Sequence, residues 1–245
     1  DNTSRAIAPL AAKELGQNII MTNREGASNA IAVKYVYDQA ADGYNILFGA
    51  ESIQMGKVLG TTELDYDNFI PINIFCQSVG VVLVRPGTYE TITDLVNAML
   101  EKPGEIRSAI TGPSGTSIIV DAMFTNLLGT KPNEITFDGE GPAVTALLGG
   151  HVDYTAVTMS AASEMIKSGD LVPLALIHNE PLEGFEDIPL VTSAYPEFEK
   201  FLPWGPFFGA WVKEGTPDDV VEILRDAFAK AVVADEFQEF LTTSG

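Results

Sequence analysis

Short runs of small, hydroxylated and acidic residues stand directly before apolar, helix-like stretches at four places in this chain. The four stretches are DNTSRAIAPL (1–10), TGPSGTSIIVDAMF (111–124), DGEGPAVTALL (138–148) and TMSAASEMI (158–166). A helix N-terminus leaves backbone N–H groups unpaired and carries a partial positive charge, so it can bind a carboxylate or phosphate without Lys or Arg. A single junction of this kind favours an ordinary capped turn. Several such junctions in one chain favour an anion-binding site.

Residues suited to catalysis or metal binding are few, and their spacing matches no mechanism. The two histidines, His151 and His178, lack the spacing of a general base or a metal ligand. GPSGT differs from a nucleophile elbow because Gly115 falls one position early. Cys76 stands alone in an apolar run, which favours an inert core thiol. We therefore expect no catalysis, no cofactor and no metal. An enzyme would need an ionisable pair taken from Asp138, Glu140, His151 and Asp153.

The elements that must position these junctions alternate between short β-rich runs and amphipathic helical runs. In the first part the pattern predicts helices at 3–15, 28–40 and 91–104, and strands at 17–22, 44–49, 68–77 and 79–86. From residue 105 it predicts strands at 106–110, 134–137, 152–157 and 171–177, and helices at 116–128, 142–148 and 160–168. A strand at 207–212 and a helical region at 216–241 follow.

This order predicts an α/β protein with two lobes. Four strands joined by helices make 105–206 a parallel, doubly wound domain, lobe 2. The last strand and helix are too small to form a domain, so we expect lobe 1 to comprise 1–104 plus 207–245. Ligands of open α/β sheets bind outside the carboxyl ends of the strands, where two such lobes would leave a cleft.

The charge of the chain limits its partners. Its 245 residues include 14 Lys and Arg against 34 Asp and Glu, for a formal net charge of -20. A field of this sign repels polyanions, so we expect neither nucleic acid nor an anionic membrane surface as a partner. No apolar run approaches the roughly 20 residues of a transmembrane helix. The sequence shows no signal peptide, and we expect one to have been removed or not included. The single cysteine excludes an intrachain disulfide and is compatible with either side of a membrane.

The ordered set of motifs resembles the solute receptors of tripartite tricarboxylate transporters, the Bug or TctC-like family. The resembling segments run in family order over nearly the whole chain: DNTSR, GQNIIMTNREGASNAIA, DGYNILFGA, DNFIPI, KPGEIRSAITGPSGTS, DGEGPAVTALLGGHVD and FFGAWVKEGTPDDVVEIL. The resemblance implies a two-lobed, type II periplasmic binding protein fold with an interdomain ligand cleft. It also implies a periplasmic or otherwise extracytoplasmic location.

The resemblance implies a receptor that captures a small carboxylate: a di- or tricarboxylate, an amino acid or an aromatic acid. Such receptors present the ligand to a membrane permease and catalyse nothing, and we expect a monomer. A ligand-sensing domain of a signalling or regulatory system, or an enzyme on the same scaffold, is the alternative. The family has a strand and a Gly-rich loop before the position of Asp1 and a helical tail after that of Gly245, so we expect lobe 1 to lack both.

The resemblance also indicates the ligand-binding residues, because loop backbone and small polar side chains hold the ligand in the family, often with bridging water. Carried onto this sequence, they are Asp1, Asn2, Ala50, Glu51, Ser114, Gly115, Thr116, Ser117, Asp138, Gly139, Glu140, Met159 and Ser160. Glu51 replaces a small polar residue of the family, and Glu140 is near it in the family pattern. With Glu140 nearby, Glu51 would disfavour a second ligand carboxylate unless Glu51 is protonated or pairs with a cation. We therefore expect a ligand with a positive group or with only one carboxylate, unless Glu51 points to solvent.

Overall fold

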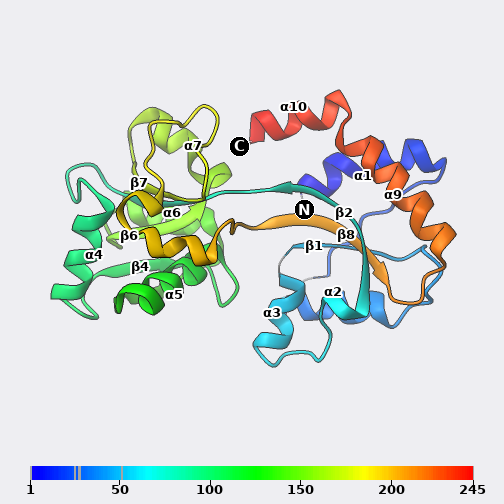
Figure 1. Cartoon of the computed structure of the whole chain (residues 1–245), viewed down its shortest axis with the longest axis horizontal. Helices are drawn as coiled ribbons and strands as arrows, with labels where there is room; N and C mark the ends of the chain where they lie inside the picture. The colour runs from blue at the N-terminus through cyan, green and yellow to red at the C-terminus, as the bar shows by residue number, and fades with distance from the viewer. Residues whose placement is uncertain (1, 25, 27–28, 51, 245) are drawn as a thin grey trace. The chain divides into compact units, whose positions relative to one another are not determined.

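The computed structural model of the chain describes residues 2–24, 26, 29–50 and 52–244 (Figure 1). It divides into two compact units, each with its own sheet and core. Unit 1 comprises the chain up to Gln77 together with Phe207–Ser244, and unit 2 comprises Ser78–Pro206. The α/β class expected from the sequence is confirmed.

Unit 1 is built around a three-stranded sheet in the order β1-β8-β2, in which both pairs are antiparallel. Its strands are β1 (Ile46–Ala50), β2 (Phe69–Gln77) and β8 (Phe207–Lys213). Side chains of a strand point alternately to its two faces, so Ala210 and Val212 of β8 join one core and Trp211 joins another. Because β8 is buried on both faces, its sequence is a nearly continuous apolar run.

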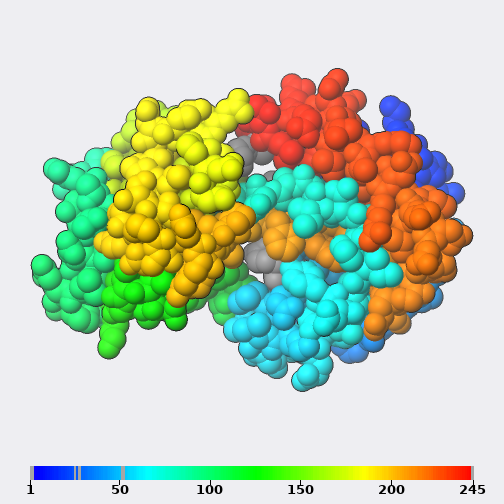
Figure 2. Space-filling view, in the orientation of Figure 1, coloured from blue at the N-terminus to red at the C-terminus, as the bar shows by residue number. Residues whose placement is uncertain are grey.

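Helices cover both faces of the unit 1 sheet. They are α1 (Asn2–Leu15), α2 (Ala30–Tyr37), α3 (Ser52–Val58), α9 (Asp218–Val232) and α10 (Asp235–Ser244), and a 3-10 turn at Tyr66–Asn68 precedes β2. On one face, Phe228 of α9 is fully buried, and its ring stacks on that of Phe75 with centroids 5.5 Å apart. On the other face, Val33 of α2 belongs to the same core as Trp211. Figure 2 shows α9 and α10, in orange and red, on the surface of unit 1.

Unit 2 is built around a five-stranded sheet in the order β5-β4-β6-β3-β7. Its strands are β3 (Gly80–Val84), β4 (Arg107–Ile110), β5 (Asn133–Thr136), β6 (Tyr154–Thr158) and β7 (Val172–Ile177). β4 is parallel to both β5 and β6, whereas β3 is antiparallel to both β6 and β7. The sheet is therefore mixed.

Helices lie on both faces of the unit 2 sheet. One core includes Leu95 of α4 (Ile92–Glu101) and Phe124 of α5 (Thr116–Leu128), together with Phe198 of the 3-10 helix Pro196–Phe201, which follows α8 (Val191–Ala194). The other includes Leu147 of α6 (Glu140–Leu148) and Ala162 of α7 (Met159–Ser168). Helices therefore cover both faces of this mixed sheet.

Two predictions about the lobes are wrong: the boundary between them and the direction of one strand. Lobe 1 was expected to extend to residue 104. Residues 78–104 belong to unit 2 instead, because β3 lies between β6 and β7 and α4 packs on the same core. The sheet was expected to be parallel, but β3 runs against both of its neighbours. The second division of the structure lies between Pro206 and Phe207, and the predicted lobe 2 also ends at residue 206.

The local predictions differ from the structure at three further places. Residues 17–22 form no strand, because β1 pairs with β8 alone and the segment lies along α1, where Ile20 is 87% exposed. The helical region 216–241 is two helices that meet at the exposed Val233. Helix α3 was not predicted, since Gly56 in its interior lowers helix propensity.

Candidate functional site

Three of the four predicted junctions meet at one edge of the unit 2 sheet. β4, β5 and β6 are parallel neighbours, so their C-terminal ends point the same way and lead into α5, α6 and α7 (Figure 1). Phe137 after β5 donates its N–H to the carbonyl of Ile110 at the end of β4, at 2.8 Å. We call residues 111–118, 137–141 and 158–161 the carboxyl edge.

The first residues of β3 connect two of these junctions. Gly80 is paired with Thr158 across the ladder between β3 and β6. A Cβ atom placed on Gly80 would lie 3.5 Å from the Cγ2 atom of Thr116. Gly80, which has no side chain, therefore lies next to the N-termini of both α5 and α7.

The loop before α5 has a closely defined shape. Gly112 adopts φ 88°, a conformation that favours glycine, and Gly115 is the N-cap residue of α5. A Cβ atom on Gly115 would lie 2.0 Å from Thr111 Oγ1 and 2.9 Å from the Thr111 carbonyl oxygen. The fully buried Ser117 accepts the Thr111 N–H at its Oγ, at 2.8 Å. Ser117 thus braces the loop from inside, while the N–H groups of residues 116–118 have no carbonyl of their own helix to bond.

The junctions after β5 and β6 are tied together by Glu140, the first residue of α6. Its Oε1 atom accepts the Thr158 N–H at 2.9 Å, and its Oε2 atom accepts the Thr158 hydroxyl at 2.6 Å. Thr158 Oγ1 also lies 3.0 Å from the Oγ of the exposed Ser160. A carboxylate of the chain itself therefore occupies the N-terminus of α7.

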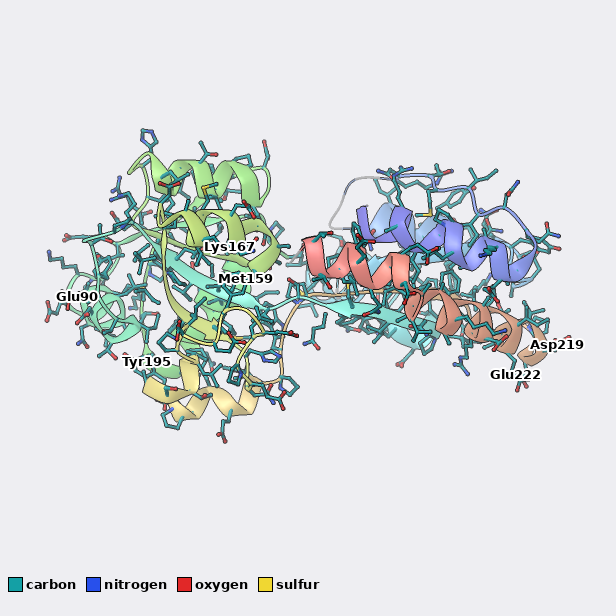
Figure 3. The ribbon with its side chains drawn as sticks, turned by 90° about the horizontal axis from the view of Figure 1, so that it is seen from above. Glu90, Met159, Lys167, Tyr195, Asp219 and Glu222 are labelled. Atoms are coloured by element: carbon teal, nitrogen blue, oxygen red, sulfur yellow. The ribbon has the colours of Figure 1, made fainter. Side chains whose placement is uncertain are left out.

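The other predicted residues of unit 2 differ in how they face this edge. Ser114 is half-buried, whereas Asp138 and Gly139 are exposed. Met159 is 1% exposed within the core beside α6, and it donates its N–H to the Val79 carbonyl at 2.8 Å. The structure therefore does not present the side chain or the N–H of Met159 at the carboxyl edge. Figure 3 shows Met159 at the start of α7 and Lys167 near its other end.

The remaining predicted residues lie in unit 1 or outside the described residues. Asp1 and Glu51 are outside them. Asn2 begins α1, and Ala50 ends β1 with its carbonyl oxygen 3.4 Å from the Tyr66 hydroxyl. The structure thus brings together the predicted residues of unit 2 that lie on the carboxyl edge, while Asn2 and Ala50 belong to unit 1.

The ionisable residues considered for an enzyme lie at opposite edges of the unit 2 sheet. Asp138 and Glu140 follow β5, whereas Asp153 precedes β6. Asp153 binds Arg107, the first residue of β4, with Nη2 to Oδ1 at 2.8 Å. Burial opposes ionisation of Asp153, but the hydrogen bonds and charge of Arg107 hold its pKa below the ordinary value. Within the described residues, no group of three or more His, Cys, Asp or Glu could hold a metal ion.

A buried acid that the sequence did not single out lies behind the carboxyl edge. Asp121, in the second turn of α5, is 1% exposed, and its Oδ1 accepts the hydroxyl of Tyr154 at 2.7 Å. Burial raises the pKa of Asp121 to about 7, against the opposite effect of the Ser108 and Tyr154 hydroxyls. The buried Ser108 hydroxyl is near enough to favour the ionised form of Asp121, but neither its Oγ nor Asp121 Oδ2 makes a hydrogen bond of ordinary length among the described residues. The only sequence signal for Asp121 is an acid within an apolar helical run.

Two other features lie away from this edge. A groove of about 750 Å³ follows α1 and residues 16–21 of unit 1 and includes none of the predicted ligand-binding residues. Burial raises the pKa of the Cys76 thiol on β2, which disfavours its reactive thiolate form.

None of the described helices is long and apolar enough to cross a membrane.

Comparison with known proteins identifies a matching family. The model of the family described as tripartite tricarboxylate transporter family receptor, TctC, matches residues 3–245. Protein BugT of Bordetella pertussis is 26% identical over 251 residues, which cover 100% of this chain and 76% of that protein.

Solved structures give the same result for the fold. A TctC solute binding protein from Polaromonas is 28% identical with a TM-score of 0.82, over 99% of this chain and 82% of that one. MatC from Rhodopseudomonas palustris, solved with bound malate, is 24% identical with a TM-score of 0.84, over 100% and 84% of the two chains. The periplasmic binding protein BugD is 23% identical with a TM-score of 0.80, over 100% and 82%. The predicted periplasmic binding protein fold is confirmed.

Proposed function

Because the chain belongs to the tripartite tricarboxylate transporter receptor family, we propose that it captures a small carboxylate and holds it at the carboxyl edge of unit 2. The family consists of periplasmic solute-binding proteins, in agreement with the expected location and with the absence of catalysis. The enzyme and sensory alternatives left open by the sequence have no support in this membership.

The N-terminus of α5 is the observation that carries the proposal. Its N–H groups at residues 116–118 point out of a helix of 13 residues, and the dipole of that helix favours a negative charge. The loop in front of it is held by Gly115, which has no room for a side chain, and by the buried Ser117. A site fixed in this way binds an anion without reorganising, which improves affinity.

The other parts of the site are proposed from the family resemblance. Malate in the relative MatC supports a small carboxylate as the ligand class. Of the predicted unit 1 residues, Asn2 and Ala50 lie among the described residues, and they remain predictions together with Asp1 and Glu51. We further propose that the protein delivers its ligand to the membrane permease subunits of such a transporter, that it is a monomer, and that it binds no nucleic acid, because its net charge is -20.

The proposal is tested by carboxylate binding to the wild type and to two glycine variants. Thermal unfolding is followed with malate, succinate, adipate and their monocarboxylate counterparts, and calorimetry gives the dissociation constants. A ligand at 100 times its Kd should add roughly 2.7 kcal/mol to the free energy of unfolding. Gly115→Ala should weaken binding at least about tenfold, because the new Cβ must displace Thr111.

Gly129→Ala is the matched control. Gly129 ends the same helix with φ 75° and has nothing near its Cβ position, so the substitution strains α5 without touching its N-terminus. It should lower the melting temperature and leave the Kd unchanged. Absence of a melting shift with every carboxylate, or equal affinity of Gly115→Ala and the wild type, would contradict the proposal.

A further inference from the structure

The N-terminus of α7 already holds an anion, and that anion is Glu140. Each of its carboxylate oxygens accepts one hydrogen bond from Thr158, at 2.9 Å from the N–H and at 2.6 Å from the hydroxyl. The next N–H of the helix, that of Met159, is bonded to the carbonyl of Val79, the residue before β3. The N–H groups of Thr158 and Met159 are therefore in use before any ligand arrives.

Glu140 is stable in this position without a cation. It is the first residue of α6 as well as a neighbour of the α7 N-terminus, and a negative charge is favourable at both places. Its hydrogen bonds to Thr158 satisfy both oxygens of the ionised carboxylate.

The carboxyl edge contains no positive side chain to offset this charge. Residues 111–118, 137–141 and 158–161 include Asp138 and Glu140 but no Lys or Arg. The cation carried by α7 is Lys167 in its last turn, where it lies over the ring of Phe185 at 5.5 Å. A second ligand carboxylate near α7 would therefore meet the negative side chain of Glu140 without a positive side chain of this edge to offset it.

We propose that Glu140 determines ligand specificity by acting as an internal carboxylate, so that the carboxyl edge selects ligands with one carboxylate over otherwise similar ligands with two. The inference rests on the proposed function, because it requires that the α5 N-terminus binds a carboxylate. Two like charges several ångströms apart in a partly desolvated site repel strongly enough to change a Kd by roughly tenfold or more.

The experiment compares matched pairs of ligands on three proteins. The pairs are succinate with butyrate, glutarate with pentanoate, and adipate with hexanoate, which differ by one carboxylate at constant chain length. Calorimetry on the wild type, Glu140→Gln and Glu164→Gln gives the ratio of the two dissociation constants in each pair. Glu164 is the matched control, because it is an exposed acid on α7 away from the helix N-terminus.

We expect the wild type to prefer the monocarboxylate in the pairs that it binds. Glu140→Gln should shift the ratio toward the dicarboxylate by about tenfold, because the amide keeps an acceptor for the Thr158 N–H while losing the charge. Glu164→Gln should leave the ratio within about twofold of the wild type, since an exposed charge is screened by solvent and salt. Circular dichroism and melting curves check the fold, and Glu140→Ala provides the same charge loss if the Gln variant is misfolded.

The outcomes separate the inference from the proposed function. A wild type that prefers the dicarboxylate, or equal shifts in Glu140→Gln and Glu164→Gln, would overturn the role of Glu140 while leaving carboxylate capture intact. A wild type that binds no carboxylate in any pair would overturn both.

Discussion

Replacing Asp121 by Asn should stabilise unit 2 at neutral pH and have little effect at acidic pH. The Asp121 carboxyl is 1% exposed, and one of its oxygens has no hydrogen-bond partner among the described residues. An Asn side chain has nearly the same shape and no charge. Its Oδ1 can accept the Tyr154 hydroxyl, as Asp121 does, and its amide can donate to the unpaired Oγ of Ser108.

The size of the effect follows from the pKa of this carboxyl. Burial raises it from 3.8 to about 7 in the folded protein, a difference of about three pKa units. Below pH 3.8 the carboxyl is protonated in both states and costs nothing. Between 3.8 and 7 the unfolded state ionises first, so stability falls as pH rises, at about 1.36 kcal/mol per unit. Above pH 7 the carboxyl is ionised in both states, and the total loss of unfolding free energy is about 4 kcal/mol.

The variant lacks this titration, so its advantage over the wild type should grow from near zero at pH 4 to about 4 kcal/mol at pH 8. Urea unfolding at several pH values measures the difference, and all other titrating groups cancel in the comparison. Trp204 packs against the unit 2 core and reports on that unit by fluorescence when Trp211 is replaced by Phe in both proteins. Tyr154→Phe, which removes the donor to Oδ1, should extend the pH dependence to higher pH.

A difference between Asp121→Asn and the wild type that is the same at pH 4 and pH 8 would refute this reasoning. So would a variant that loses stability relative to the wild type as pH rises. Either result would mean that the carboxyl is ionised in the folded protein near pH 5, with partners that its surroundings do not provide.

Three other predictions concern the cores, a helix cap and ligand capture. Phe228→Ala should lower the free energy of unfolding of unit 1 by about 3–5 kcal/mol in urea titrations, because it removes a fully buried ring that stacks on Phe75. Thr91→Ala should cost about 1 kcal/mol in unit 2, because Thr91 and Asp94 form the capping box of α4, and a Thr93→Ala control should cost less. Added salt should modestly raise the association rate of an anionic ligand in stopped-flow experiments, since the net charge is -20, and a falling rate would contradict this.

Local sequence patterns were sufficient to locate most helices and strands. Helix α5 covers 116–128, the predicted range, because Gly115 stands at its N-cap and Gly129 ends it in the left-handed conformation. The four strands predicted between residues 105 and 177 correspond to β4, β5, β6 and β7. These elements depend on neighbouring residues, which the sequence displays directly.

The errors concern pairing partners, which local patterns do not contain. The run at 80–84 reads as a buried strand, but its sequence does not say that it inserts between β6 and β7 in the second sheet. Residues 17–22 have the composition of a strand and no strand neighbour among the described residues. A strand needs a partner for its backbone hydrogen bonds, so composition alone cannot decide whether one forms.

The candidate site shows the same division between local and nonlocal information. The alternation of strands and helices predicted that a ligand binds outside the carboxyl ends of the strands, and the parallel ladder of β4, β5 and β6 brings three helix N-termini to one such edge. The role of Glu140 depends on a contact with Thr158, 18 residues away, and on the rotamer of one side chain. The sequence identified Glu140 as a negative group in this region without indicating which helix holds it.

The anion preference of this edge follows from its donors and its charges. At α7, the N–H groups of Thr158 and Met159 are bonded to Glu140 and to the Val79 carbonyl. At α6, Gly139 donates its N–H to Phe137 and Pro142 has none. At α5, the N–H groups of residues 116–118 have no carbonyl of their own helix to bond, in a chain whose overall charge repels anions. Affinity for an anion must then come from short-range donors such as these, and the charge of Glu140 opposes a second anion beside one held at α5.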